Sequence, residues 1–268
     1  MTDIHLQEAR GSQSPKTKPA PKASAIPVPF TYNPSDDATD ENLLILLHGL
    51  GDTHEPFGKL GRQLKLPQTV TLALRAPQQI PFLYEQAFQW YTSFDPLGEL
   101  VERPDPTPAL ELLDRILAHL TKDCAWPPGR IHFFGFAQGG SVAAEVALRW
   151  WRAEFERQHQ DEGYTVRPLG TIVSVSGPLM SYPTLSTLCP TPVLLFHRTP
   201  PAESALKASD IAAFRKGFSR FIEVKKGTKD GMPASKDEWE PIMRFWSERL
   251  GKRPMEGLYE VMSGVSAQ

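Results

Sequence analysis

Residues 135–140 (GFAQGG) are the stretch of this chain whose residue types and spacing bear most directly on chemistry. The apolar run 131–134 precedes them and the small-residue run 139–144 follows, so we expect a buried strand, a tight turn and a helix. That geometry presents a serine nucleophile to ester or thioester carbonyls in the G-x-S-x-G motif. Here the central residue is Ala137, and a methyl group cannot attack a carbonyl carbon.

The elements that must position this turn alternate between strand and helix. Continuous apolar runs such as 43–47 and 193–196 are typical of strands buried on both faces of a parallel sheet. Alternating strands and helices predict an α/β fold with a doubly wound, mostly parallel sheet in a single domain. Strands are expected at 28–32, 43–48, 69–74, 130–135, 169–176, 192–197 and 218–224, and helices at 56–64, 109–120, 139–151, 204–217 and 238–250.

Three compositional shifts divide the chain. Residues 1–26 are rich in Pro, Lys and Ser and lack the apolar content needed to offset ordering entropy, which predicts a disordered tail. The domain is expected at 27–251, and 252–268 form a C-terminal tail. Inside the domain, the proline-rich segment 95–108 is expected to be a surface loop. The polar segment 152–168 is expected to lengthen the connection after the helix that follows the turn.

Composition excludes several classes of function. The net charge of −2 gives no electrostatic case for nucleic-acid binding. No apolar run approaches the roughly 18 residues of a membrane span, so integral membrane association is not expected. The two cysteines, Cys124 and Cys189, indicate neither a metal site nor a disulfide framework. We expect a cytoplasmic protein, with a nuclear location as the alternative.

Two motifs resemble those of one family. Residues 46–53 (LLHGLGDT) resemble the L-H-G-L-G-D-T signature of the acyl-protein thioesterases, a phospholipase/carboxylesterase family of α/β-hydrolases, and GFAQGG resembles its G-F-S-Q-G-G turn. Between them, residues 75–77 (RAP) and 89–91 (QWY) resemble two further landmarks in the same order. The similarity covers roughly residues 40–250, and it implies the α/β-hydrolase fold.

The resemblance also implies a chemistry. Members of the family are serine hydrolases that cleave thioesters of palmitoylated proteins, or esters such as lysophospholipids, with a Ser-Asp-His triad and no cofactor. The serine attacks, the histidine moves its proton, and the aspartate fixes the histidine tautomer. By motif position, the backbone N–H groups of Leu50 and Gln138 would form the oxyanion hole. Such donors need no particular side chain.

The three triad positions of the resemblance are vacant in this chain. Ala137 stands at the nucleophile, Pro201 at the acid in segment 197–201, and Ala234 at the base in segment 231–235. The fold requires the histidine to follow the other two residues, yet none of the seven histidines lies beyond His197. A family-like general base is therefore missing from the last part of the chain.

Four readings of these vacancies are open. The first is a catalytically inactive pseudoenzyme with a binding or regulatory role, whose partner is an acyl or ester ligand or another protein. The second is a carboxylesterase or acyl-protein thioesterase with residual or relocated catalytic groups. The third is an engineered nucleophile-to-alanine variant, which by itself would retain the acid and the base. The fourth is a structural interaction module with a collapsed pocket.

Four further residues are candidates for the pocket. His54 lies in the loop after Leu50 and either faces the vacant site or is solvated. Trp90 belongs to one of the family landmarks. Ser176 ends a strand at the edge where active sites gather, although such a serine more often bonds loop backbone. Asp230 lies near the vacant base and is either a site residue or a turn residue.

Overall fold

The computed structural model describes residues 5–7, 17–81, 86–253 and 260–262. Its centre is a seven-stranded sheet with strand order β10-β9-β8-β7-β3-β4-β2. Every neighbouring pair is parallel except β2–β4, which is antiparallel and forms one edge. The strands are β2 (Phe30–Asn33), β3 (Asn42–Leu47), β4 (Thr69–Leu74), β7 (Ile131–Phe136), β8 (Ile172–Val175), β9 (Val193–His197) and β10 (Phe221–Lys225).

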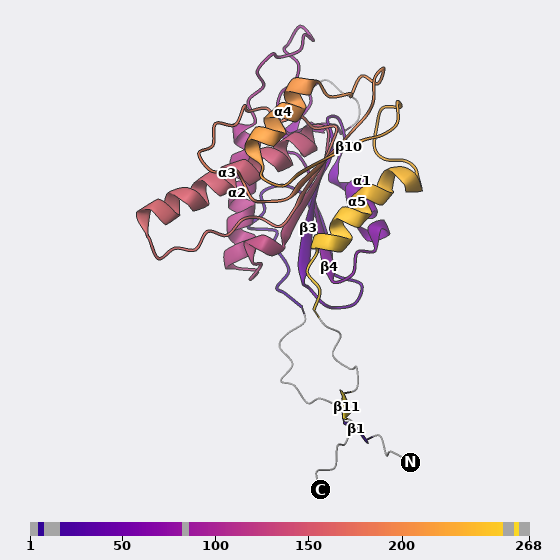
Figure 1. Ribbon diagram of the computed structural model, residues 1–268. Coiled ribbons are helices and arrows are strands. Elements are labelled where there is room, and N and C mark those ends of the chain that lie inside the picture. Colours follow the sequence, from indigo (N-terminus) through magenta and orange to yellow (C-terminus); the bar gives the residue numbers. More distant parts are fainter. Residues whose placement is uncertain (1–4, 8–16, 82–85, 254–259, 263–268) are drawn as a thin grey trace.

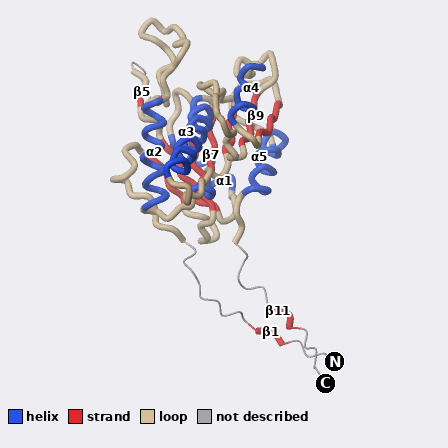
Figure 2. Tube along the Cα trace, turned by 60° about the vertical axis from the view of Figure 1, so that its left-hand side comes forward, coloured by secondary structure: helices blue, strands red, loops and turns tan. Residues whose placement is uncertain are grey.

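Helices cover both faces of this sheet. On one face α2 (Thr107–Lys122), α3 (Gln138–Gln160) and α4 (Ala208–Gly217) bury their apolar sides. On the other face lie α1 (His54–Leu64) and α5 (Lys236–Arg249). Figure 1 shows the sheet nearly edge-on between the two layers, and Figure 2 shows α2 and α3 running together. The predicted α/β, doubly wound and mostly parallel fold is confirmed.

The central strand explains why the sheet is buried on both sides. All six residues of β3 are buried, and its side chains alternate between the two helical layers. Leu43, Ile45 and Leu47 face the layer of α2 and α3. Leu44 and Leu46 face the layer of α1 and α5. An uninterrupted apolar run is therefore what a strand in this position requires.

The helix after the turn is longer than predicted. It ends at Gln160, so the first half of the polar segment 152–168 is helical rather than a connection. The physical reason is Glu154, whose side chain is fully buried although it is charged. It accepts hydrogen bonds from the Tyr164 hydroxyl at 2.8 Å and from the Arg167 N–H at 2.8 Å. These partners fold the following loop back onto the helix and stabilise its last turns.

Helix α4 begins later than predicted, at Ala208 rather than at residue 204. The Lys207 N–H donates to the Asp210 carboxylate at 2.8 Å, which is an N-terminal capping contact. The short strands β5 (Gln78–Gln79) and β6 (Phe88–Gln89) were not predicted. Two residues are too few for a period-two pattern to be recognised.

Part of the expected N-terminal tail contacts the domain. The Lys18 N–H donates to Asp40 at 2.7 Å, and the Lys22 N–H donates to Nε2 of His119 at 3.1 Å. Ile26 is buried in the core. The packed part of the chain thus begins before residue 27. Farther out, β1 (His5–Gln7) pairs antiparallel with β11 (Glu260–Met262), so these two short segments lie side by side (Figure 1).

A buried histidine in β7 makes folding sensitive to acid. His132 is 1% exposed, and burial lowers its pKa to about 3, with Arg130 acting in the same direction. Between the ordinary pKa of about 6.5 and this value, the unfolded chain binds a proton that the folded chain excludes, so stability falls as the pH falls. We expect the wild type to lose about 2 kcal/mol more than His132→Gln between about pH 7 and pH 5.

Urea denaturation at the two pH values measures this difference. Glutamine at position 132 does not titrate and retains a polar group for Thr171, whose hydroxyl lies 2.9 Å from Nδ1 of His132. Other histidines with lowered pKa values contribute equally to both proteins. Identical pH dependence in the two proteins would exclude His132 as the source.

Candidate functional site

The turn between β7 and α3 keeps the strained backbone of a nucleophile elbow. Ala137 has φ 47° and ψ −115°, a conformation that residues with a Cβ atom rarely adopt. Two hydrogen bonds hold it: the Ala137 N–H donates to Val175 at 2.8 Å, and its carbonyl accepts from the Ser141 N–H at 3.0 Å. Ala137 is only partly buried, so the turn is not closed off from solvent. The geometry that presents a nucleophile is retained without the nucleophile.

Close backbone approach explains the glycines of the turn. A Cβ atom on Gly139 would lie 2.4 Å from the Leu47 carbonyl oxygen and 2.5 Å from that of His48. A Cβ atom on Gly135 would lie 2.2 Å from the carbonyl oxygen of Gly139 itself. No side chain fits at these distances, because all the neighbours are backbone. The glycine pattern therefore follows from packing, whether or not the turn is catalytic.

The resemblance assigns the oxyanion hole to the backbone N–H groups of Gln138 and Leu50, whose surroundings differ. Gln138 is the first residue of α3, so its N–H has no carbonyl partner within the helix and lies at the positive end of the helix dipole. Leu50 follows β3 in a loop that is fixed by the Gly51 N–H donating to Phe88 at 2.9 Å. The Leu50 side chain is 38% exposed.

The Gln138 side chain has a structural role of its own. Its amide oxygen accepts from the Trp90 N–H at 2.9 Å. Its amide nitrogen donates to the Tyr91 carbonyl at 2.9 Å and to the Ser93 hydroxyl at 2.7 Å. These bonds attach the loop after β6 to the start of α3.

His48 is also a structural residue. Its Nε2 accepts from the Ala76 N–H at 2.9 Å, so its proton is on Nδ1, which donates to the Gly49 carbonyl at 2.7 Å. Burial lowers the pKa of His48, and the hydrogen bond that Nε2 accepts from Ala76 requires the neutral ring. With both nitrogens occupied, His48 is not free to serve as a general base.

The positions of the expected acid and base are exposed. Pro201 and Ala234 both lie at the surface, and the Ala234 N–H donates to Glu238 at 2.8 Å. Arg198, which immediately follows β9, lies beneath these loops and is 2% exposed. It forms an ion pair with Glu238, whose pKa is held below its usual value mainly by this contact.

Arg198 also joins the two loops through backbone. Its guanidinium donates to the carbonyls of Gly231 at 3.0 Å, Met232 at 2.8 Å and Lys226 at 3.3 Å. The loop that would carry the acid and the loop that would carry the base are therefore connected by a buried cation. Sequence reasoning missed this pair, because its two residues are 40 positions apart and form no local pattern.

The remaining candidates lie in different surroundings. Trp90 is fully buried and donates from Nε1 to the His48 carbonyl at 2.8 Å. Asp230 is exposed and accepts from the Ser204 hydroxyl and from the Ser204 N–H at 2.8 Å, and the hydroxyl contact is the main reason for its lowered pKa. It acts there as a loop residue.

His54 and Ser176 each carry a buried polar atom with no hydrogen-bond partner among the described residues. His54 is the first residue of α1, and burial lowers its pKa. Ser176 follows β8 with φ 54°. It is adjacent to the elbow, because a Cβ atom on the next residue, Gly177, would lie 2.5 Å from the Ala137 carbonyl oxygen.

A groove of about 990 Å³ begins at Leu50 and Gly51. Apolar side chains of Leu50, Ile80 and Phe94 contribute to its wall. Among the described residues that line it are also segments of the predicted 95–108 loop, but not His54, Trp90, Ser176 or Asp230. Of the candidates, only the oxyanion-hole position Leu50 therefore borders this groove. The sequence offered no signal for Ile80, because its role depends on how β5 and the loop fold together.

The described residues hold neither a metal centre nor a membrane-spanning helix. They contain no cluster of three or more His, Cys, Asp or Glu side chains that could hold a metal ion. Within the same ranges, no helix combines the length and the apolar character that a membrane crossing requires.

Comparison with known proteins identifies relatives over most of the chain. Residues 29–245 match the family model described as Phospholipase/Carboxylesterase. An uncharacterized hydrolase of Mycosarcoma maydis is 38% identical over 228 residues, which cover 84% of this chain and 82% of the relative. An uncharacterized hydrolase of Schizosaccharomyces pombe is 28% identical, over 78% of this chain and 83% of the relative.

Solved structures share the fold at low identity. The esterase PE8 aligns with a TM-score of 0.62 and 22% identity, over 83% of this chain and 98% of that protein. Zea mays acyl-protein thioesterase 2 aligns with a TM-score of 0.59 and 20% identity, over 84% of this chain and all of that protein (100%).

Proposed function

The chain belongs to the phospholipase/carboxylesterase family of α/β-hydrolases, and we propose that it binds an acyl or acyl-ester group without cleaving it. The observation that carries this proposal is the tie between Arg198 and Glu238. It occupies the junction of the two loops from which a catalytic acid and base would act. The elbow, the backbone donors and the groove remain, but the nucleophile position is Ala137 and the loops of the acid and the base are joined by this ion pair instead. The triad that would move a proton is therefore not in its family positions.

The groove supports an acyl ligand. Its volume of about 990 Å³ is at the upper end of the range for small-molecule sites, and its apolar wall suits a hydrocarbon chain. It starts at Leu50, whose backbone N–H is one of the two proposed carbonyl-binding donors. A carbonyl held there would have its chain next to apolar surface.

One observation favours a second candidate, a hydrolase with a relocated nucleophile. Ser176 is buried, has positive φ, and its hydroxyl has no hydrogen-bond partner among the described residues. A fluorophosphonate probe mapped by mass spectrometry tests this candidate. A label on Ser176 would favour relocated catalysis, whereas an unlabelled chain at high probe concentration favours binding alone.

Restoring the nucleophile alone is expected to restore little. The variant Ala137→Ser places a hydroxyl on the strained elbow, but no histidine follows His197 to stand where the family places the general base, which contributes about 10²–10⁴-fold. We expect its turnover of p-nitrophenyl acetate to stay within about tenfold of the wild type, with heat-denatured protein as background. Turnover in the ordinary esterase range would mean that a base is present elsewhere.

Binding is tested with a ligand that cannot be hydrolysed. A hexadecyl thioether analogue of a palmitoyl-cysteine peptide is expected to raise the melting temperature of the wild type, because binding to the folded state stabilises it. Leu50→Glu places a charge in the groove wall and should remove the shift. Leu188→Glu is the matched control, since Leu188 is 40% exposed and Leu50 is 38% exposed. An unchanged melting temperature in the wild type would point to a structural module.

A further inference from the structure

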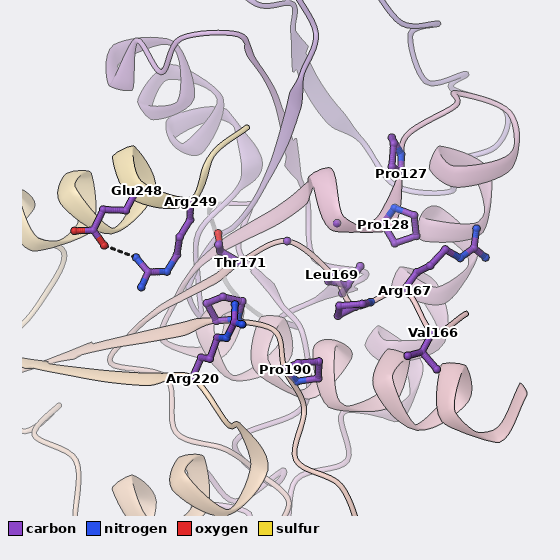
Figure 3. Close-up of a pocket in the computed structure, with 14 residues that line it drawn as sticks. Pro127, Pro128, Val166, Arg167, Leu169, Thr171, Pro190, Arg220, Glu248 and Arg249 are labelled. Atoms are coloured by element: carbon purple, nitrogen blue, oxygen red, sulfur yellow. Dashed lines mark hydrogen bonds and ion pairs between the residues drawn. The ribbon is translucent and has the colours of Figure 1, made fainter. Parts of the chain in front are cut away.

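A second concave site lies at the opposite edge of the sheet. A pocket of about 680 Å³ is lined by residues that precede β7, β8, β9 and β10 and by the last turn of α5 (Figure 3). We call it the amino-edge pocket. Strand β7 has six residues, so it separates this pocket from the elbow by about 20 Å. The two sites are therefore distinct, and a ligand in one does not touch the other.

The wall of the amino-edge pocket is poor in hydrogen-bond donors. Leu169 and Val166 add apolar surface to it. Proline has no backbone N–H, so a proline-rich wall presents carbon surface and few donors. Five of the lining residues are prolines: Pro127, Pro128, Pro168, Pro190 and Pro192.

The donors of this pocket are concentrated on arginines. Arg167, Arg220 and Arg249 come from three different parts of the fold. Arg167 lies 3.8 Å from the buried Glu154 carboxylate. In the described part of the chain, Arg220 is exposed, and its guanidinium forms no ion pair and no side-chain hydrogen bond.

Contacts fix the Arg249 side chain without using all of its hydrogen-bond donors. Its Nη1 donates to Glu248 at 2.7 Å and to the Phe245 carbonyl at 3.3 Å, and the guanidinium lies 4.5 Å from the centre of the Phe245 ring. Both hydrogen bonds use Nη1, which leaves Nε and Nη2 without partners among the described residues. Figure 3 shows Arg249 and Arg220 on the same side of the pocket, and Arg167 on the other side.

We propose that the amino-edge pocket binds a small amphiphilic anion, whose carboxylate or phosphate is held by Arg220 and Arg249 and whose apolar body lies on the prolines. Two guanidiniums with a single local carboxylate leave an excess of positive charge, which an anion neutralises. The volume matches that of a small-molecule site. This site is independent of the proposed acyl groove.

Isothermal titration with four probes tests the ligand class. Decyl phosphate and decanoate, below their micelle-forming concentrations, are each expected to bind the amino-edge pocket once per chain. This is measured in the Leu50→Glu background, where the added charge keeps acyl chains out of the groove, and the tighter of the two identifies the head group. Decanol lacks the charge and inorganic phosphate lacks the apolar body, so both should bind at least about tenfold more weakly. Binding should weaken as salt is added. Absence of binding by both amphiphilic anions overturns the proposal.

Single substitutions then locate the site. Arg220→Ala should weaken binding by about 10- to 100-fold, as expected for the loss of a charge-assisted hydrogen bond. Arg215→Ala, which removes another exposed arginine outside the pocket, should change it less than twofold. Leu50→Glu, in the acyl groove, should leave it unchanged. If Leu50→Glu abolishes binding and Arg220→Ala does not, the anion lies in the groove, and the amino-edge pocket is not the site.

Discussion

Replacing Glu238 with alanine is expected to lower the free energy of unfolding by about 3 kcal/mol. Removing one partner of a buried ion pair leaves a desolvated charge, here the Arg198 guanidinium, which is 2% exposed. The expected loss is at the lower end of the known range because three backbone carbonyls still accept from Arg198. The Ala234 N–H loses its acceptor in the same variant.

Chemical denaturation measures this loss. Glu240→Ala is the matched control, because Glu240 is 51% exposed and lies 3.5 Å from the exposed Arg244, a pair expected to contribute less than about 1 kcal/mol. The double variant Arg198→Met/Glu238→Leu should recover most of the loss, since it removes the buried charge together with its partner. A cost for Glu238→Ala no larger than that of the control would contradict the role assigned to this pair.

The loss of stability caused by Glu238→Ala is expected to depend on pH in one direction. The pKa of Glu238 is lowered in the folded chain, so its stabilising effect is full above the unfolded-state pKa of about 4.3. The effect is lost as the pH falls through the folded-state pKa. The difference in stability between the wild type and Glu238→Ala should therefore shrink in acid.

Replacing Gly139 with alanine is expected to cost more than about 3 kcal/mol or to prevent folding. The added methyl group would lie 2.4 Å and 2.5 Å from two carbonyl oxygens of the central strand and its end. Relief requires β3 and α3 to separate, because no flexible side chain can move aside. The elbow would lose its geometry together with the packing.

Gly129→Ala is the control for this substitution. A Cβ atom at position 129 would meet only the Pro168 carbonyl oxygen, at 3.8 Å, which is an ordinary contact. We expect the free energy of unfolding of Gly129→Ala, measured in guanidinium, to lie within about 1 kcal/mol of the wild-type value. A stable, cooperatively folding Gly139→Ala protein would show that the elbow tolerates a side chain and that its glycine is not a packing requirement.

The central sheet could be predicted because its signal is local. The apolar runs that form β3 and β9 are continuous, and each is bounded by polar residues or turns. The extension of α3 could not be predicted, because it depends on Glu154 meeting Tyr164 and the Arg167 backbone after the loop has folded back. Polar composition alone is as typical of a loop as of an exposed helix.

The candidate site divides in the same way. The elbow at Ala137 could be predicted from the glycines around it, because close backbone approach requires glycine at those positions. The tie between Arg198 and Glu238 joins residues 40 apart in sequence and has no local pattern. The wall of the groove is likewise assembled from separate loops. The groups that lie near the vacated positions could therefore be identified only from the contacts in the structure.

The central claim is that this family member has retained an elbow without the means to cleave an ester. The most direct measurement is the rate at which the wild-type chain releases palmitate from a palmitoyl-cysteine peptide under saturating conditions. If the chain binds acyl groups without cleaving them, release is no faster than in buffer, because the side chain at the elbow, Ala137, is a methyl group that cannot attack. Turnover in the usual enzymatic range of about 1–10³ s⁻¹ would contradict it.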